Sequence, residues 1–468
     1  MTDSLAQRLK TRHVSMIAIG GSIGTGIFLA SGYTISIGGP GGALFAYIVM
    51  AFIVYFLMTS LAEMSAYKPT SGTFCDYSTQ FVGKPFGIAM GYNYWINWAI
   101  TIAAELSAAS IAMNYWFPSV NPVVFPTIFF IMILIANILS VRIYGEIEYA
   151  MSFVKVAVII IFIVLGAASL FAQPNFGAHN WKIGDAPFHH GLFGFISVFL
   201  LAGFSFQGTE LVGVASGETE NPKVTIPKSI KYVFWRIALF YILSIGVLTL
   251  LMPYNDQSLV NQNSVEMSPY TLIFSKYISH YAGDIVNFVI LIAILSAANA
   301  SLYSSTRILW YLSKTKQAPS IFSKTNRFAV PGAALFATAL VGSAVFFSSF
   351  VGNGVLFSYL MQISALSGFI AWFGIALSHY QFRKNYLPRH GGLDILTYRA
   401  KFYPYAQIFA MFMITFVIAG QFIPILHITK HPISDLLLTY SSLILFGTLY
   451  FFCKIWFYYK MKFSEART

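Results

Sequence analysis

The chain has 468 residues, of which 57% are hydrophobic and only 9% are charged, and its mean hydropathy is +0.69. Soluble domains carry about 25% charged residues, so this composition excludes a soluble globular protein and indicates an integral membrane protein. A net charge of +12 would suggest a nucleic-acid partner in a soluble chain. Here the placement of the basic residues indicates membrane topology instead, and no nucleic-acid partner is expected.

Apolar stretches of membrane-spanning length, about 20 residues, recur along the whole sequence and predict an all-α fold. No soluble domain fits between them, and no cleavable signal is expected because the first stretch has no small-residue processing site and another follows at once. The twelve predicted spans are 14–37, 43–66, 86–116, 123–141, 150–171, 192–215, 232–253, 281–312, 332–351, 355–378, 403–426 and 434–458.

Basic residues are distributed unequally between the two sides of the predicted bundle. Of the 28 Lys and Arg residues, 24 fall on one side, one (Lys155) lies inside a span, and three lie on the other side, namely Lys182, Lys276 and Lys430. Because basic loops stay cytoplasmic, the pattern predicts cytoplasmic termini in a multi-pass protein of the cytoplasmic membrane. The excess charge would also attract anionic lipids.

The first predicted span is interrupted by glycines in its middle. The stretch MIAIGGSIGTGIFLASG, residues 16–32, holds Gly20, Gly21, Gly24 and Gly26 where a membrane helix should be continuous. Glycine has low helix propensity, and a break at mid-membrane depth is tolerated where the freed backbone lines a cavity. The break therefore predicts a ligand site in a solute carrier. The alternative is close helix packing through small residues.

The sixth predicted span repeats this pattern. Its core GFSFQGTEL, residues 203–211, can be laid over GGSIGTGIF, residues 20–28, and both place a serine and a Gly-Thr pair inside an apolar span. The two spans lie five helices apart, which predicts an inverted repeat. Helices 1–5 would occupy residues 14–190 and helices 6–10 residues 191–380. Residues 381–458 would add helices 11 and 12, with terminal segments at 1–13 and 459–468.

Two broken helices form a site for both a carboxylate and an ammonium group. The N–H groups that restart a helix favour an anion, and the carbonyls that end the preceding half favour a cation. A zwitterionic amino acid carries both charges. The predicted carboxylate site consists of backbone N–H groups around Ile23, Thr25 and Gly26, and Gly24 is expected to line the same substrate site. The predicted ammonium site consists of carbonyl groups around Ser22, Phe204 and Gln207.

Several motifs in register resemble the amino-acid permeases of the amino acid, polyamine and organocation superfamily. They are AIGGSIGTGIF, YKPTSGTFCDYSTQFVG, GFSFQGTELVGVASGETENP, VFWRIALFY and SAANASLYSSTRILW. FQGTEL and GETENP look most like the lysine-specific and basic amino-acid permeases. The resemblance implies a leucine-transporter-like 5+5 inverted repeat, with helices 1 and 6 broken, and proton-coupled import. Lysine ranks first, and exchange or transport of arginine, ornithine or histidine remains an alternative.

Lys155 is an ionisable residue inside a predicted span, where such a group costs about 2.5–3.5 kcal/mol on insertion scales. The resemblance implies that this helix 5 lysine replaces the ion that joins helices 1 and 8 in sodium-coupled relatives, so Lys155 would couple transport to protons. Its ammonium would reach carbonyls near Gly20 and hydroxyls such as that of Ser301. The alternative is snorkelling to the cytoplasmic headgroups, where Glu148 is also expected.

Two carboxylates are predicted to lie near the substrate. Glu105 on helix 3 and Glu210 at the end of the second break would give a cationic substrate its counter-charge, and Glu210 could also take part in proton coupling. The alternative is that both are structural carboxylates bound by backbone N–H groups or hydroxyls. Phe204 and Phe206 flank the break and would close over the substrate. His379 is expected at the membrane interface.

Other function classes lack their motifs in this sequence. HExxH and P-loop patterns are absent, and the GxSxG match at residues 20–24 lies inside the apolar first span rather than on a strand-to-helix turn. Neither an enzyme nor an ATP-driven pump is therefore indicated. No cofactor and no metal are expected. A channel is an alternative because broken helices also build filters, and an amino-acid sensor on a transporter fold is the alternative outside transport.

Overall fold

The structure is a computed structural model that describes residues 11–70, 72–138, 141–172, 177–214, 219, 221–256, 259, 268–428 and 432–465. Several sequence predictions fall partly outside these ranges. They include the N-terminal segment up to residue 10, residues 139 and 140 of the fourth predicted span, residue 215 of the sixth, residues 217, 218 and 220 of the GETENP motif, Lys430, and residues 466–468 of the predicted tail.

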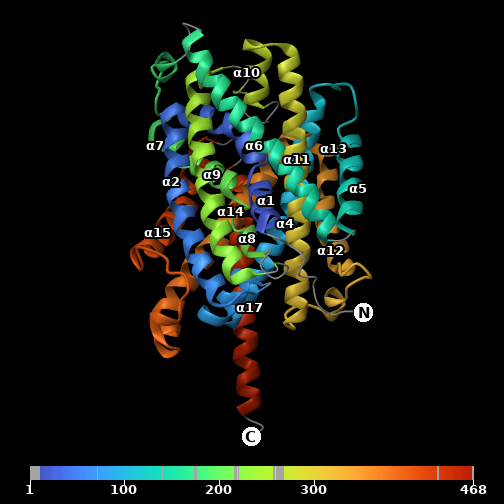
Figure 1. The fold of residues 1–468 in the computed structure, drawn as a ribbon, viewed down its shortest axis with the longest axis vertical. Helices are drawn as coiled ribbons and strands as arrows, with labels where there is room; N and C mark the ends of the chain where they lie inside the picture. The colour runs from blue at the N-terminus through green and yellow to red at the C-terminus, as the bar shows by residue number, and fades with distance from the viewer. Residues whose placement is uncertain are drawn as a thin grey trace.

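Helices dominate the described part, and long ones run roughly along the vertical axis of Figure 1. The α-helices are α1 (Thr11–Ser22), α2 (Ser31–Tyr67), α3 (Thr73–Tyr77), α4 (Lys84–Asn114), α5 (Val124–Ile138), α6 (Val141–Ala172), α7 (Gly191–Phe206), α8 (Leu211–Val214), α9 (Pro222–Leu251), α10 (Pro269–Tyr277), α11 (His280–Lys314), α12 (Gly332–Gly342), α13 (Ser348–Val351), α14 (Asn353–Gln381), α15 (Tyr405–Gly420), α16 (Phe422–Ile428) and α17 (Pro432–Glu465). The π-helical segments are η1 (Gly26–Ala30), η2 (Ser78–Val82) and η7 (Phe382–Tyr386), and the 3-10 segments are η3 (Ala178–Trp181), η5 (Ser320–Ser323), η6 (Ser343–Phe347), η8 (Leu387–Arg389) and η9 (Gly392–Ile395).

Within the described residues, 8 helical stretches are long and apolar enough to cross a membrane. Shorter apolar helices occupy Val124–Ile138, Ile237–Leu251 and Tyr405–Gly420. The structure is therefore that of an all-helical, multi-pass membrane protein. Figure 1 shows α17 extending beyond the other helices toward the C-terminus.

The first apolar stretch, Val14–Tyr67, turns back on itself at Gly39. Gly39 has φ 72° and ψ 174°, and Pro40 follows it. This conformation suits glycine, and the proline that follows also disfavours helix at the preceding residue. A straight helix of 54 residues would be about 80 Å long, against a hydrocarbon core of about 30 Å. The turn is therefore needed for the stretch to fit the membrane.

Helix α4 lies among α11 and α14 and carries a buried polar stripe. Asn93, Asn97, Thr101 and Glu105 are four residues apart and all buried, so they lie on one face of the helix. Ser367 of α14 donates to Asn93 at 3.0 Å. Such hydrogen bonds satisfy polar groups that would otherwise be costly in a membrane bundle.

The connection before α7 is organised by Asp185. Its carboxylate accepts from the hydroxyl of Tyr254 at 2.7 Å, lies 2.6 Å from Nδ1 of His189, and accepts from the backbone N–H of His190 at 3.2 Å. The Tyr254 hydrogen bond, followed by those of the two histidines, holds the pKa of Asp185 well below its usual range, while slight burial opposes the shift. The charged form of Asp185 therefore stabilises this connection.

Glu63 near the end of α2 binds the segment that follows α14. Its carboxylate lies 3.1 Å from Nε2 of His379, accepts from Arg383 Nε at 2.6 Å, and accepts from the N–H of Ala400 at 2.5 Å. His379 is fully buried. Its partner is a carboxylate from α2, which the local sequence does not show, and its expected position at the membrane interface stays a prediction.

Candidate functional site

The first helix is broken, as its glycines predict. Helix α1 ends at Ser22, and the π-helical η1 begins at Gly26. Ile23 N–H still bonds to the carbonyl of Ile19 at 2.9 Å. Across the described residues, no backbone acceptor is recorded for the N–H groups of Gly24, Thr25 and Gly26. These three donors therefore lie at the restart of the helix, where an anion is favoured.

The second break lies at the end of α7. This helix ends at Phe206, Gln207 is extended, and α8 begins at Leu211. Gly208 has φ 100°, a conformation that side chains rarely adopt. Gln207 Nε2 donates to the carbonyl of Ala365 in α14 at 3.0 Å. Helix 6 is thus interrupted at the predicted position, and Gln207 attaches the break to α14.

The two breaks pass each other in opposite directions. A Cβ atom on Gly26 would lie 2.9 Å from the backbone nitrogen of Ser205, and one on Gly208 would lie 2.5 Å from the carbonyl carbon of Gly21. Gly21 thus lies beside Gly208, and Gly26 lies beside Ser205. The two backbone segments therefore run antiparallel to each other. The glycines allow this backbone-to-backbone approach, which a side chain on either would prevent.

Glu105 reaches the first break from α4. Its Oε1 accepts from the hydroxyl of Thr25 at 3.0 Å, and the Thr25 backbone also interacts with this carboxyl group. A Cβ on Gly24 would lie 3.1 Å from the same oxygen. Oε2 is buried and has no hydrogen-bond partner among the described residues. Glu105 therefore presents one free acceptor beside the break.

Glu210 lies at the second break and is bound by three donors. Its Oε1 accepts from the Tyr94 hydroxyl at 3.2 Å, and Oε2 accepts from the N–H of Gly208 at 3.2 Å and from Trp372 Nε1 at 3.3 Å. A carboxylate accepts about four hydrogen bonds. Glu210 thus closes the turn between α7 and α8 and is more fully bound than Glu105.

Lys155 of α6 is fully buried, and its ammonium donates to the carbonyl of Gly20 at 2.5 Å. Because the Lys155 ammonium is buried and bound to a backbone carbonyl, the side chain does not snorkel to the headgroups in this structure. Ser301 instead donates to Ala297 of its own helix at 2.7 Å. Glu148, expected on the cytoplasmic flank, is also fully buried, and it accepts from the hydroxyl of Ser296. The junction of α1, α6 and α11 thus holds two buried ionisable groups.

Aromatic rings pack behind the breaks. The Phe206 ring lies 5.0 Å from that of Tyr241 and 6.0 Å from that of Tyr47, and it is fully buried. The Tyr241 hydroxyl donates to the carbonyl of Ser22 at 2.7 Å. Phe204 is 6% exposed, and its carbonyl accepts from the N–H of Gln207 at 3.2 Å. Phe206 is therefore part of the packed core in this conformation.

Asn97, Thr101 and Ser364 join the site without having been predicted. Ser364 Oγ lies 2.7 Å from Oγ1 of Thr101 and 2.8 Å from Oδ1 of Asn97. Nδ2 of Asn97 is buried without a partner among the described residues. The four-residue polar spacing that ends at Glu105 is a signal in the sequence that could have identified the two α4 residues. Ser364 needs the tertiary contact between α4 and α14.

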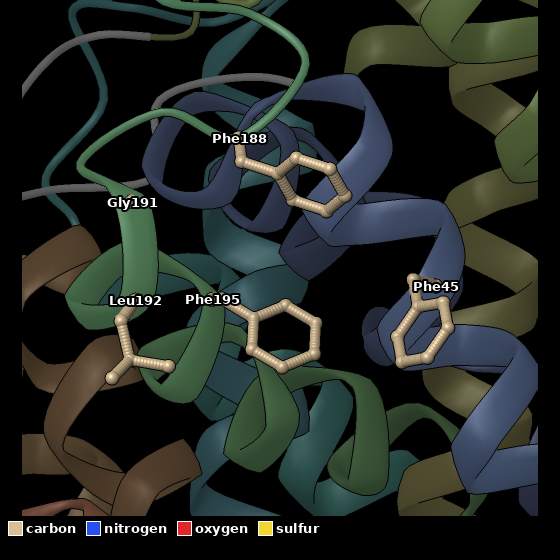
Figure 2. Close-up of a pocket in the computed structure, with 5 residues that line it drawn as sticks. All are labelled: Phe45, Phe188, Gly191, Leu192 and Phe195. Carbon is tan, nitrogen blue, oxygen red and sulfur yellow. The ribbon is translucent and has the colours of Figure 1, made fainter.

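An apolar surface groove of about 390 Å³ lies elsewhere, between α2 and the start of α7. Figure 2 shows the rings of Phe45 and Phe195 facing each other across it, with Phe188 above and Leu192 beside them. These side chains provide no charged partner for a zwitterion, which needs paired charges when it leaves water. The broken helices are therefore the better candidate for the functional site.

The amino acid permease model matches residues 13–467 of this chain. The chain belongs to the amino acid permease family. This match confirms the resemblance in the motifs, and together with the apolar helices it makes the protein a multi-pass permease for amino acids.

Three curated relatives are similar over most of their length. The lysine-specific permease LysP of Escherichia coli (strain K12) is 45% identical over 424 residues, 89% of this chain and 86% of the relative. The LysP of Lactococcus lactis subsp. cremoris (strain MG1363) is 44% identical over 461 residues, 96% and 90% of the two chains. The histidine permease HisP of the same strain is 41% identical over 454 residues, 96% and 94%.

Proposed function

We propose that this permease imports L-lysine across the cytoplasmic membrane by proton symport with alternating access. The observation that carries the proposal is the antiparallel meeting of two helix breaks beside the half-bound carboxylate of Glu105. Similarity to two permeases named lysine-specific, at 45% and 44% identity, supports lysine as the substrate. Similarity to a permease named for histidine makes histidine the second candidate.

The proposed pose uses backbone groups for the substrate's α-carbon. Its carboxylate binds the N–H groups of Gly24 and Gly26. Thr25 and Ile23 border the pocket, because the Thr25 backbone is bound to Glu105 and the Ile23 N–H is bonded to Ile19. The α-ammonium binds the carbonyls around Ser22, Phe204 and Gln207. The Phe204 carbonyl accepts from the N–H of Gln207, and a carbonyl oxygen has two lone pairs.

The side chain of lysine needs a counter-charge in the membrane interior. Glu105 Oε2 is the buried acceptor without a recorded partner in the described part of the chain, so we assign the ε-ammonium to Glu105. Glu210 already accepts three hydrogen bonds, and its proposed role is to hold the second break and to open it when protonated. Phe204 closes over the substrate, and Phe206 supports it from the core.

Proton coupling is assigned to Lys155. Its hydrogen bond to Gly20 joins α6 to the half-helix before the break, and its charge interacts with those of Glu105 and Glu148. Loss of its proton would weaken the contact with α1 and allow this half-helix to move. Glu210 is the second candidate for the coupling group.

The proposed topology has twelve spans, a 5+5 inverted repeat and cytoplasmic termini. The first of the eight candidate stretches supplies two passes, one before and one after Gly39. The three shorter apolar helices each supply one more pass, which brings the total to twelve. The antiparallel crossing of the breaks supports the inverted repeat. The basic-residue distribution supports the orientation.

Counterflow of radiolabelled lysine in liposomes tests the proposal. Unlabelled lysine should drive saturable exchange, with arginine, ornithine and histidine as weaker competitors. Cadaverine lacks the carboxylate, and a lysine ester neutralises it, so both should compete poorly. Conductance without saturation would identify a channel, binding without flux a sensor, and strong competition by cadaverine would contradict the carboxylate site.

A further inference from the structure

Helix α6 carries a second buried charge that the proposed function does not use. Glu148 lies seven residues before Lys155 and is 0% exposed. Residues seven apart lie on one face of a helix, two turns or about 10 Å apart along its axis. A buried carboxylate inside a membrane bundle is expensive and is by default a candidate functional group.

The carboxyl group of Glu148 packs directly against the half-helix before the first break. A Cβ atom on Gly20 would overlap Glu148 Oε1, so no side chain could separate the two. Oε1 also accepts from the hydroxyl of Ser296 in α11. Oε2 is buried and has no hydrogen-bond partner among the described residues. Glu148 thus has one anchored oxygen and one free oxygen.

Lys155 is the charged group that faces Glu148. Side chains on a helix lean toward its N-terminus, so the Lys155 side chain leans back toward Glu148, and its ammonium already binds the carbonyl of Gly20. Glu148 and Lys155 interact electrostatically, while α11 contributes Ser296 and Asn299 and α6 contributes Ser152. The ammonium and the carboxylate therefore converge on Gly20 from one helix.

We propose that Glu148 carries the coupling proton between Lys155 and the side of the membrane where α6 begins. When the lysine stem moves the Lys155 ammonium from the Gly20 carbonyl to Glu148, one proton leaves the ammonium and binds Glu148 Oε2, which leaves a neutral amine and a neutral carboxylic acid. The acid then gives this proton to water at the beginning of α6, and the carboxylate re-forms. The four-carbon lysine stem supplies the reach. The inference rests on the proposed proton symport.

The test compares three proteins in liposomes, namely wild type, Glu148→Gln and Glu146→Gln. Glutamine keeps an oxygen for the Ser296 hydroxyl but cannot take up the proton. Glu146 is an exposed acidic residue of the same helix turn, which makes its variant a matched control. An imposed gradient of one pH unit supports at most about tenfold lysine accumulation per coupled proton.

Glu148→Gln should lose this accumulation, with an internal-to-external ratio near one, while it keeps lysine counterflow, which needs no net proton transfer. Glu146→Gln should keep both, and Glu148→Asp should recover part of the accumulation. Accumulation by Glu148→Gln at the wild-type level would overturn the inference. So would loss of counterflow together with accumulation, because that result assigns Glu148 to structure.

Failure of the proposed symport would give a different result. In that case wild-type protein itself would not accumulate lysine under the gradient. If wild type and Glu148→Gln accumulate lysine to the same level, proton symport stands and the relay through Glu148 is refuted.

Discussion

Substitution of Gly208 by alanine tests the close approach of the two helix breaks. The new Cβ would lie 2.5 Å from the carbonyl carbon of Gly21 and 2.8 Å from the backbone nitrogen of Ser22. It would also force a side chain into a φ of 100°. A left-handed conformation costs about 1–2 kcal/mol, and overpacking costs about 1–3 kcal/mol. The free energy of unfolding should therefore fall by about 2–5 kcal/mol.

Gly246→Ala in α9 is the matched control. A Cβ there has nothing within 4 Å, and alanine gains up to about 1 kcal/mol of helix propensity over glycine. Both variants make the same change in the unfolded chain, so their difference reports the folded state. Reversible unfolding in detergent micelles measures it, and counterflow measures function. Equal stability of the two variants would refute the close approach of Gly208 to the first break.

Three further predictions follow from buried or bound carboxylates. Glu63→Gln removes the fully buried carboxylate that binds the largely buried guanidinium of Arg383 and should lower the free energy of unfolding by about 3–5 kcal/mol. Asp394→Asn, whose ion pair is exposed, should change it by at most about 1 kcal/mol, and equal losses in micelles would contradict this. Asp185 has a lowered pKa because the Tyr254 hydroxyl binds its charged form, so its stabilisation is present above the ordinary pKa and is lost as the pH falls. The difference in free energy of unfolding between wild type and Asp185→Asn should therefore shrink below about pH 4. A difference that grows below this pH would contradict the prediction. Glu105→Gln should weaken lysine binding far more than binding of a neutral amino acid, measured by competition, and equal weakening would assign Glu105 to structure or gating.

The sequence predicted the broken helices because glycine clusters inside apolar spans have a direct backbone consequence. Gly24 and Gly26 lie at the first break, and Gly208 turns the second. The expected contact of Lys155 with a carbonyl near Gly20 is also present, although its coupling role remains a proposal. Long apolar stretches gave most helix bounds to within a few residues, because membrane length limits them.

The remaining contacts depend on how distant segments pack. Sequence hydropathy does not show that α1 and α11 cover Glu148. It also does not show that His379 is buried against Glu63, which lies more than 300 residues away in the sequence. A hydrogen bond between two distant helices leaves no repeating pattern in the sequence from which it could be predicted.

In the proposed mechanism, Lys155 couples lysine import to protons. Accumulation of radiolabelled lysine in liposomes, with a pH gradient of one unit and the membrane potential clamped, tests it most directly. Wild type should accumulate lysine up to about tenfold per coupled proton, while Lys155→Ala should show no accumulation but retain counterflow. Lys155→Arg should also fail to accumulate lysine, because a guanidinium does not deprotonate in proteins. Accumulation by either variant at the wild-type level would contradict the account and move the coupling site to Glu210.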